Sequence, residues 1–116
     1  MDTTTARKRL EEICSELERS ISVLKGEQQE DERTLEYPQD PADAGANLSE
    51  SERSEAILAA ARSQRSQVLD ALRRIELGTY GTCVDCGAGV PEGRLEAKPE
   101  ASRCVKCQGK WDRLRR

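Results

Sequence analysis

The sequence predicts a mainly α-helical protein, an antiparallel coiled-coil hairpin followed by a small four-cysteine zinc finger and a short C-terminal helix. Two observations lead to this prediction. Two long segments carry apolar residues at heptad spacing with a proline-containing break between them, and two Cys-x-x-Cys pairs follow, with seventeen residues between the pairs. Of the 116 residues 35% are charged and none is phenylalanine, which leaves too little bulk for a thick globular core. We expect the hairpin over residues 1–77 and the metal module over residues 78–116.

The first helix is expected from about residue 5 to residue 35, because this stretch lacks proline and contains a single glycine. Its apolar residues recur at spacings of three and four, as in a coiled coil, with Gln28 at the skipped position. They are Leu10, Cys14, Leu17, Ile21, Leu24 and Leu35. Cys14 falls within this stripe, and we interpret it as a small buried hydrophobic residue rather than a redox group.

The second helix is expected from Ser49 to Leu77. The segment Ser49-Glu50-Ser51-Glu52 has the form of a capping box, in which serine and glutamate side chains satisfy the free N–H groups of a helix start. The apolar stripe of this helix is Ile57, Ala61, Gln64, Val68, Ala71 and Ile75. Gly78 should end the helix, because glycine readily adopts the left-handed conformation common at helix C-termini.

The two stripes fit a single antiparallel seam. Residues that face each other across such a seam have numbers with a constant sum, which is 85 here. The predicted layers are Leu10 with Ile75, Cys14 with Ala71, Leu17 with Val68, Ile21 with Gln64, Leu24 with Ala61, and Gln28 with Ile57.

Residues 36–48 are expected to form the tip loop of the hairpin, because two prolines and one glycine interrupt helices there. The segment also carries Asp40 and Asp43. The residue pattern alone favours turn chemistry for these acids, since Asp before Pro and Asp near Gly stabilise bends. The alternative is a pair of carboxylates that contacts a basic surface, or a metal ion held by a partner.

Cys83, Cys86, Cys104 and Cys107 have the spacing of a tetrahedral metal site. Four thiolates suit zinc and leave no position open for water, and the chain contains no histidine. A closed shell of this kind indicates a structural zinc ion rather than a catalytic one. The segment from residue 81 to residue 116 is also shorter than the roughly 40 residues below which a chain usually needs a metal or a disulfide to fold.

Two alternatives to zinc remain open from the sequence. A pair of disulfides is disfavoured because Cys14 makes the cysteine count odd and no signal peptide is evident, which together indicate a reducing, cytoplasmic location. A rubredoxin-like iron site shares the four-thiolate chemistry. Aromatic residues usually shield such iron sites, and only Tyr80 and Trp111 lie nearby in the sequence, so zinc is favoured.

Charge is distributed unevenly along the chain. Residues 1–50 carry thirteen acidic and six basic side chains, whereas residues 83–116 carry five acidic and eight basic ones. A protein that binds DNA on its own is usually basic throughout, so we expect a protein partner and no sequence-specific DNA binding. We also expect the chain to be a monomer. The longest apolar run, Ile57–Ala61, is far shorter than the roughly 20 residues of a membrane span.

The combination of a coiled-coil hairpin, a tip reading Asp40-Pro41-Ala42-Asp43-Ala44-Gly45 and a C-terminal four-cysteine finger resembles the DksA/TraR family of bacterial transcription regulators. Further similarity lies in Gly78-Thr79-Tyr80-Gly81-Thr82-Cys83 before the first cysteine pair and in Arg94-Leu95-Glu96-Ala97-Lys98-Pro99 between the pairs. The resemblance covers about residues 35–111.

The resemblance implies a protein that binds RNA polymerase and inserts its coiled coil into the secondary channel, so that the acidic tip approaches the active centre. Asp40 and Asp43 match the two acids of the family motif Asp-x-x-Asp-x-Ala. Gly45 stands where the family has alanine, which makes the tip more flexible.

Some family members act together with ppGpp, held between polymerase and basic side chains of the second helix and the C-terminal helix. This chain has Ala60, Gln64, Gln67 and Gln108 in the corresponding stretches, so cooperation with ppGpp is not expected. Its basic C-terminal residues around Trp111 either contact an acidic rim of the polymerase or form a solvated last helical turn.

Other functions are also open from the sequence. A nucleic-acid-binding zinc module would explain the basic finger, and a coiled-coil interaction protein would explain the hairpin. An enzyme is disfavoured, because the sequence offers no nucleophile with a base, no phosphate loop and no open metal site.

Overall fold

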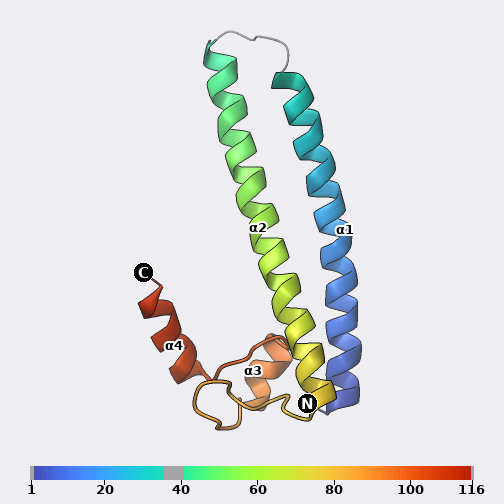
Figure 1. Cartoon of the computed structure of the whole chain (residues 1–116), viewed down its shortest axis with the longest axis vertical. Coiled ribbons are helices and arrows are strands. Elements are labelled where there is room, and N and C mark those ends of the chain that lie inside the picture. The colour runs from blue at the N-terminus through green and yellow to red at the C-terminus, as the bar shows by residue number, and fades with distance from the viewer. Residues whose placement is uncertain (1, 36–40, 116) are drawn as a thin grey trace. The chain divides into compact units, whose positions relative to one another are not determined.

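The structure is a computed structural model that describes residues 2–35 and 41–115, with side chains for residues 2–26 and 50–115. The described part is helical, as predicted, and its helices are α1 (Thr3–Leu35), α2 (Pro41–Leu77), α3 (Glu92–Ala97) and α4 (Val105–Leu114) (Figure 1). The chain divides into two units, one of residues 1–14 with 66–116 and the other of residues 15–65. In each unit a stretch of α1 runs antiparallel to a stretch of α2, which confirms the predicted hairpin (Figure 1).

The start of α1 is capped by Asp2. One carboxylate oxygen of Asp2 accepts hydrogen bonds from the backbone N–H groups of Thr4 (2.7 Å) and Thr5 (3.1 Å), and the other accepts one from the Thr5 hydroxyl (2.8 Å). Such a cap satisfies donors that have no partner inside the helix. The hydrogen bonds from Thr5 and Thr4 hold the pKa of Asp2 below its usual value.

α2 begins at Pro41, eight residues before the predicted start at Ser49, so the predicted tip loop over residues 36–48 is helical from Pro41 onward. Two properties of the sequence explain the difference. Proline is well tolerated at the first helical position, where its missing N–H costs no hydrogen bond. Three alanines follow within the next five residues and favour the helix, against the cost of Gly45.

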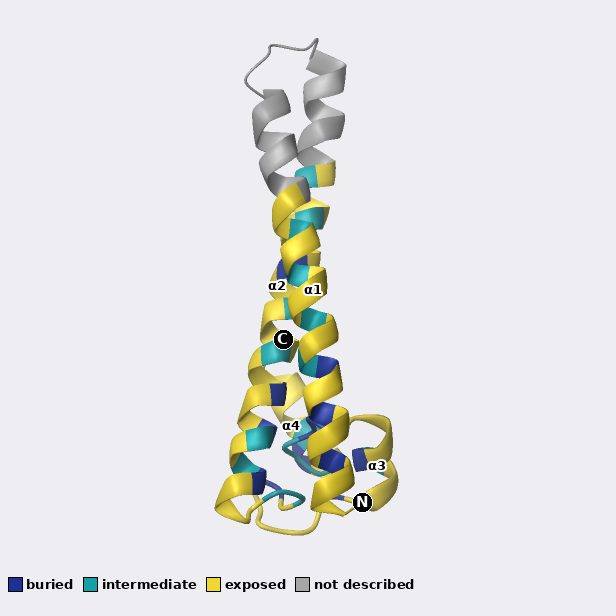
Figure 2. Cartoon of the chain, turned by 90° about the vertical axis from the view of Figure 1, so that its right-hand side faces the viewer, coloured by how far each residue is buried: buried dark blue, intermediate teal, exposed yellow. Residues whose placement is uncertain are grey.

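The unit of residues 1–14 and 66–116 buries apolar side chains of both long helices (Figure 2). Leu10 and Val68 are fully buried, and Ile75 is 8% exposed, so these predicted core positions are correct. Cys14 is half-buried rather than fully enclosed. The prediction missed two buried residues of α1, Ala6 and Ile13.

The unit of residues 15–65 uses a different phase of the α2 stripe from the one predicted. Leu58 is 4% exposed, whereas Ile57 is 50% exposed and Gln64 is exposed, so the predictions of Ile57 and Gln64 as core residues are wrong. Arg65 lies at the seam instead and donates hydrogen bonds to Glu18 of α1, with Nη2 3.1 Å and Nε 3.4 Å from Oε1. An ion pair therefore joins the helices at the seam, where the prediction placed the amide side chain of Gln64.

α2 ends as predicted at Gly78, whose φ of 76° is left-handed. The N–H of Gly78 bonds the carbonyl of Ile75 (3.2 Å) and the N–H of Thr79 bonds the carbonyl of Arg74 (2.9 Å), which closes the last turn and turns the chain toward the cysteines. None of the helices in the described part has a stretch long and apolar enough to cross a membrane.

Candidate metal centre

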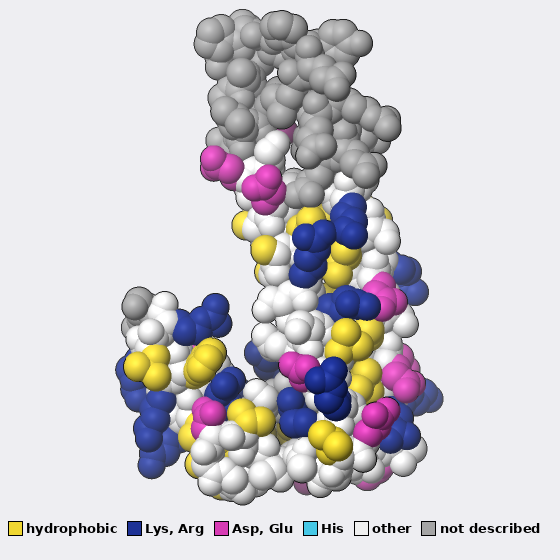
Figure 3. Space-filling model, in the orientation of Figure 1, with side chains coloured by type: hydrophobic (Ala, Val, Ile, Leu, Met, Phe, Trp, Pro, Cys, Tyr) yellow, Lys and Arg dark blue, Asp and Glu magenta, His cyan; other side chains and the backbone are white. Residues whose placement is uncertain are grey.

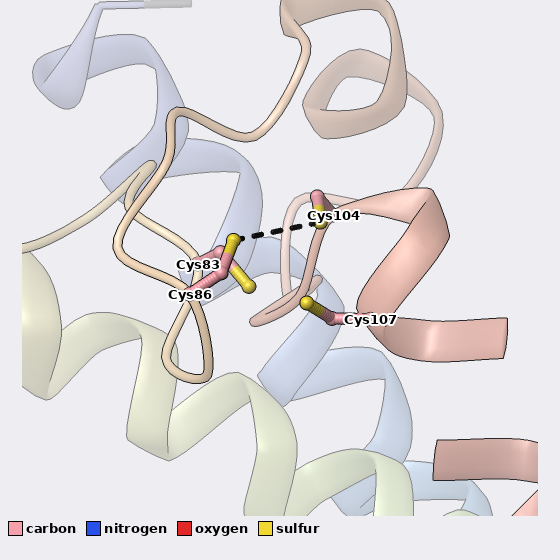
Figure 4. Close-up of side chains that lie close together, drawn as sticks. All are labelled: Cys83, Cys86, Cys104 and Cys107. Atoms are coloured by element: carbon pink, nitrogen blue, oxygen red, sulfur yellow. Dashed lines mark hydrogen bonds between the residues drawn. The ribbon is translucent and has the colours of Figure 1, made fainter. Parts of the chain in front are cut away.

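The structure brings the four predicted ligand residues together. Cys83 and Cys86 lie in the loop after α2, while Cys104 and Cys107 lie at the start of α4 (Figure 4). Cys83 and Cys107 are buried, Cys104 is half-buried and Cys86 is exposed. The two pairs come from segments separated by α3, so the folding of the loops, and not only sequence spacing, makes the cluster.

The first cysteine pair is shaped by backbone hydrogen bonds. An antiparallel β-bridge joins Thr82 to Gly89, and the N–H of Cys83 donates to the carbonyl of Ala88 (2.8 Å). Gly87, with φ of 77°, directs its N–H back to the carbonyl of Cys83 (3.0 Å). A side chain at Gly87 would be strained at this φ, so glycine supports the turn that presents both sulfurs to one side.

The second pair is set by the beginning of α4. Cys104 is the N-cap residue, and its carbonyl accepts the N–H of Gln108 (2.9 Å). One turn into the helix, Cys107 then lies on the same side as Cys104. The backbone also joins the two pairs, because the N–H of Val84 donates to the carbonyl of Ser102 (2.9 Å).

The sulfur atoms are placed for one tetrahedral ion. All four Sγ atoms lie within 4.8 Å of one another, and those of Cys86 and Cys104 are 3.9 Å apart (Figure 4). A tetrahedron with zinc–sulfur bonds of about 2.3 Å has edges of about 3.8 Å, which is close to this separation. All the cysteines are free thiols, so the disulfide alternative finds no support.

The protonation of the cluster also fits a cation. Hydrogen bonds from the backbone N–H groups of Cys86 and Cys104 lower the pKa of the Cys83 thiol to about 6, and the N–H of Cys107 lowers that of Cys104. A hydrogen bond with the side chain of Cys104, together with burial, raises the pKa of Cys107 to about 12. The thiol of Cys107 therefore resists ionisation beside its neighbours, and a positive ion among the sulfurs would favour its thiolate form.

A small apolar core supports the cysteines. Its buried members are Cys83, Val90, Leu95, Ala101 and Cys107, with Tyr80 and Cys104 packed against it. The hydroxyl of Tyr80 donates to the carbonyl of Pro99 (2.9 Å), which ties the end of α2 to the segment between the cysteine pairs. This core is too small to hold the module together alone, and a bound metal would add the missing stability.

Arg103 links three parts of the module, and no pattern in the sequence singled it out. Its Nε donates to Asp85 Oδ2 (2.7 Å), its carbonyl accepts a hydrogen bond from Arg94 Nε (2.9 Å), and its guanidinium lies 4.2 Å from the centre of the Trp111 ring. Trp111 is 40% exposed and contacts the finger through Arg103.

A cleft of about 370 Å³ lies between α2, the segment before Cys104 and α4. Among the described residues, its walls include Arg74, Lys98, Arg103 and Arg115 and one carboxylate, that of Asp70. Burial lowers the pKa of Arg74, whose Nη2 atom is buried and has no hydrogen-bond partner in the part of the chain that the structure describes. The sequence did not indicate this concentration of positive charge, because Arg74 and Lys98 are distant in the chain and only the fold brings them to the same cleft.

Comparisons with known proteins agree with this geometry. Residues 78–111 match the family model of the prokaryotic dksA/traR C4-type zinc finger. An uncharacterized protein of Aquifex aeolicus is 34% identical over 107 residues, which is 92% of this chain and 73% of that protein. The structure of transcription factor DksA2 from Pseudomonas aeruginosa superposes with a TM-score of 0.77 and 25% identity, over 97% of this chain and 84% of the other. The chain belongs to the DksA/TraR family.

A further family relative is the RNA polymerase-binding transcription factor DksA of Caulobacter vibrioides, 29% identical over 106 residues, or 91% of this chain and 70% of that protein. Within the family, the matched zinc-finger segment contains all four clustered cysteines. The module is therefore a C4 zinc finger with a site for one structural zinc ion. Four protein ligands close the coordination shell, so the zinc has a folding role.

The structure does not describe the side chains of the two predicted tip acids. Asp40 lies outside the described residues, and Asp43 belongs to α2 but its side chain is not described. The segment matched by the zinc-finger model also lies beyond them in the sequence. Their role rests on the sequence motif.

Proposed function

We propose that this chain is a transcription regulator that binds RNA polymerase and is not an enzyme. One observation carries the proposal: the likeness to DksA2 extends over 97% of this chain and includes the hairpin as well as the finger. The Caulobacter relative, which spans nearly the same length, is named for binding RNA polymerase. The proposal places the protein in the cytoplasm with the polymerase, as a monomer and without sequence-specific contacts to DNA.

In this proposal the hairpin enters the secondary channel of the polymerase. The 33 residues of α1 and the 37 residues of α2 give helices of roughly 50 Å, at about 1.5 Å per residue, long enough to reach into a deep channel. Asp40 and Asp43 would then lie near the active centre, where two carboxylates can attract or displace cationic groups and metal ions.

The finger has a supporting role in the proposal. Zinc holds the segments that carry the two cysteine pairs together, and α4 then presents its Lys and Arg side chains to an acidic rim of the polymerase (Figure 3). Cooperation with ppGpp is not part of the proposal. Gln67 and Gln108, two of the four uncharged residues on which that expectation rests, both line the cleft beside α4.

The test compares the wild-type chain with the Asp40→Asn/Asp43→Asn variant, first for binding to purified core RNA polymerase and then in multi-round transcription. A matched control is Glu52→Gln/Glu55→Gln, which removes two exposed acids of α2 away from the tip motif. We expect all three proteins to bind and the tip variant alone to lose its effect on transcription. Equal effects of the tip variant and the control variant on transcription would refute the proposed role of the tip acids.

A wild-type chain that fails to bind polymerase would refute the proposal as a whole. The basic residues of the finger then favour a nucleic-acid-binding module, which would show binding to duplex DNA with a steep dependence on salt. A coiled-coil interaction protein would instead show self-association or capture of another helix in sedimentation.

A further inference from the structure

A groove in which three of the six described lining residues are basic runs between α1 and α2 in the unit of residues 15–65. Its volume is about 560 Å³, and its charged residues are Glu18 and Lys25 of α1 and Arg62 and Arg65 of α2. Ile21 and Ser22 complete the lining. We call this surface the basic groove. Figure 3 shows one face of the helix pair on which Lys and Arg side chains gather around apolar ones.

Only part of the positive charge in the basic groove is neutralised within the chain. Glu18 pairs with Arg65 at 3.1 Å, which fixes the guanidinium of Arg65 at the seam. Lys25 and Arg62 are exposed and have no ion pair within the part of the chain that the structure describes. The groove therefore presents two free cations beside a half-buried isoleucine.

This charge is local. The described residues of the same unit include the exposed acids Glu16, Glu52 and Glu55, and the first fifty residues of the chain carry an excess of seven negative charges. A nucleic-acid strand would extend its phosphates beyond the groove and meet these acids, which repel it. A short acidic segment of a protein can place its carboxylates on the two cations and an apolar side chain on Ile21.

We propose that the basic groove binds an acidic segment of a protein partner. This proposal rests on the proposed function, so the partner is RNA polymerase. The groove contacts it from the side of the hairpin, separately from the tip acids. Exposed charge pairs of this kind raise the rate of association and fix the register more than they raise affinity. The groove would thus guide the hairpin, while Asp40 and Asp43 act at its end.

The test uses two charge-reversal variants of the full chain. Lys25→Glu/Arg62→Glu alters the groove, and Arg19→Glu/Arg53→Glu makes the same change in net charge on the same two helices outside it. Binding to core RNA polymerase is measured at about 50 mM and about 300 mM salt. At low salt we expect the groove variant to bind about tenfold more weakly and the control to stay within about twofold of wild type, with the difference shrinking at high salt.

Equal losses in the two variants, or no loss in the groove variant, would overturn the proposal. Circular dichroism of both variants checks that the helices persist. A wild-type chain that does not bind polymerase would contradict the proposed function, and the groove is then tested with a glutamate-rich peptide and a single-stranded oligonucleotide. If the wild-type chain and the control variant bind the peptide and the groove variant does not, the proposal for the groove is supported. If the groove variant instead loses binding of the oligonucleotide, or if neither probe binds, the proposal is refuted.

Discussion

An ion pair between Arg103 and Asp85 joins the two cysteine pairs of the finger. Asp85 stands between Cys83 and Cys86, Arg103 directly precedes Cys104, and the Arg103 Nε lies 2.7 Å from Asp85 Oδ2. The side chain of Arg103 is only 19% exposed, which makes this pair less screened by solvent than an ordinary surface ion pair. It therefore helps hold the two ligand loops in position relative to each other.

Replacing Arg103 with glutamine should weaken zinc binding by about tenfold, because groups that orient metal ligands from outside the coordination shell have effects of this size. Competition with a chromophoric chelator measures the change. Arg113→Gln, which removes an exposed cation of α4, is the control and should leave zinc affinity unaltered. Arg103→Lys keeps the charge but not the planar group over Trp111, so it should recover part of the loss. Wild-type affinity in the glutamine variant would contradict the role of the pair.

Removal of zinc should unfold the finger and leave most of the helical signal intact. The helical residues lie mainly in α1 and α2, whereas the apolar core of the finger is small and includes ligand residues. Trp111 is the single tryptophan and contacts Arg103, so its fluorescence reports on the finger alone. We expect a chelator to change the Trp111 emission with little change in circular dichroism. Unaltered emission after confirmed loss of metal would show that the finger folds without zinc.

The hydrogen bond from Tyr80 to the carbonyl of Pro99 should contribute about 1 kcal/mol to the stability of the zinc-loaded finger. Urea unfolding followed by Trp111 fluorescence, with Tyr80→Phe against wild type, measures this contribution. Tyr37→Phe replaces the other tyrosine of the chain and serves as the control. Equal stability of wild type and Tyr80→Phe would mean that the bond adds nothing.

The same bond predicts a dependence on pH. Burial raises the pKa of Tyr80 above its ordinary value of 10.0, so the folded state favours the neutral phenol. Its contribution is complete below pH 10 and declines as the pH rises through the raised pKa, since the unfolded chain ionises first. Above pH 10 the wild-type finger should lose stability more steeply than Tyr80→Phe. Parallel declines of the two proteins would contradict this.

The zinc site was predictable because its ligands are chemically unambiguous and the pairs are local in sequence. Cys83 with Cys86, and Cys104 with Cys107, can each be recognised from a few residues. The role of Arg103 was not predictable, because an arginine in a basic tail is usually solvated. Its contacts to Asp85 and Trp111 depend on how the loops fold. The start of α2 was misplaced for a related reason: a proline reads as a break, although it is also favourable at the first turn of a helix.

The phase of the α2 stripe could not be determined from one helix alone. Ala61, Val68 and Ile75 belong equally to a stripe through Ile57 and to one through Leu58, and both have the spacing of a coiled coil. Only packing against α1 decides between them. In the structure it selects Leu58, and Ile57 is left half exposed in a neighbouring groove with Val23 and Leu24.

Two neighbouring substitutions test the phase directly. Leu58→Ala removes a side chain that is 4% exposed and should lower the free energy of unfolding by about 2 to 3 kcal/mol, since a cavity remains in the seam. Ile57→Ala is the matched control one position away. Its side chain is 50% exposed, so the loss should stay below about 1 kcal/mol. Urea unfolding followed by circular dichroism gives both values. A larger loss for Ile57→Ala than for Leu58→Ala would restore the stripe that the sequence predicted, with Gln64 rather than Arg65 at the seam.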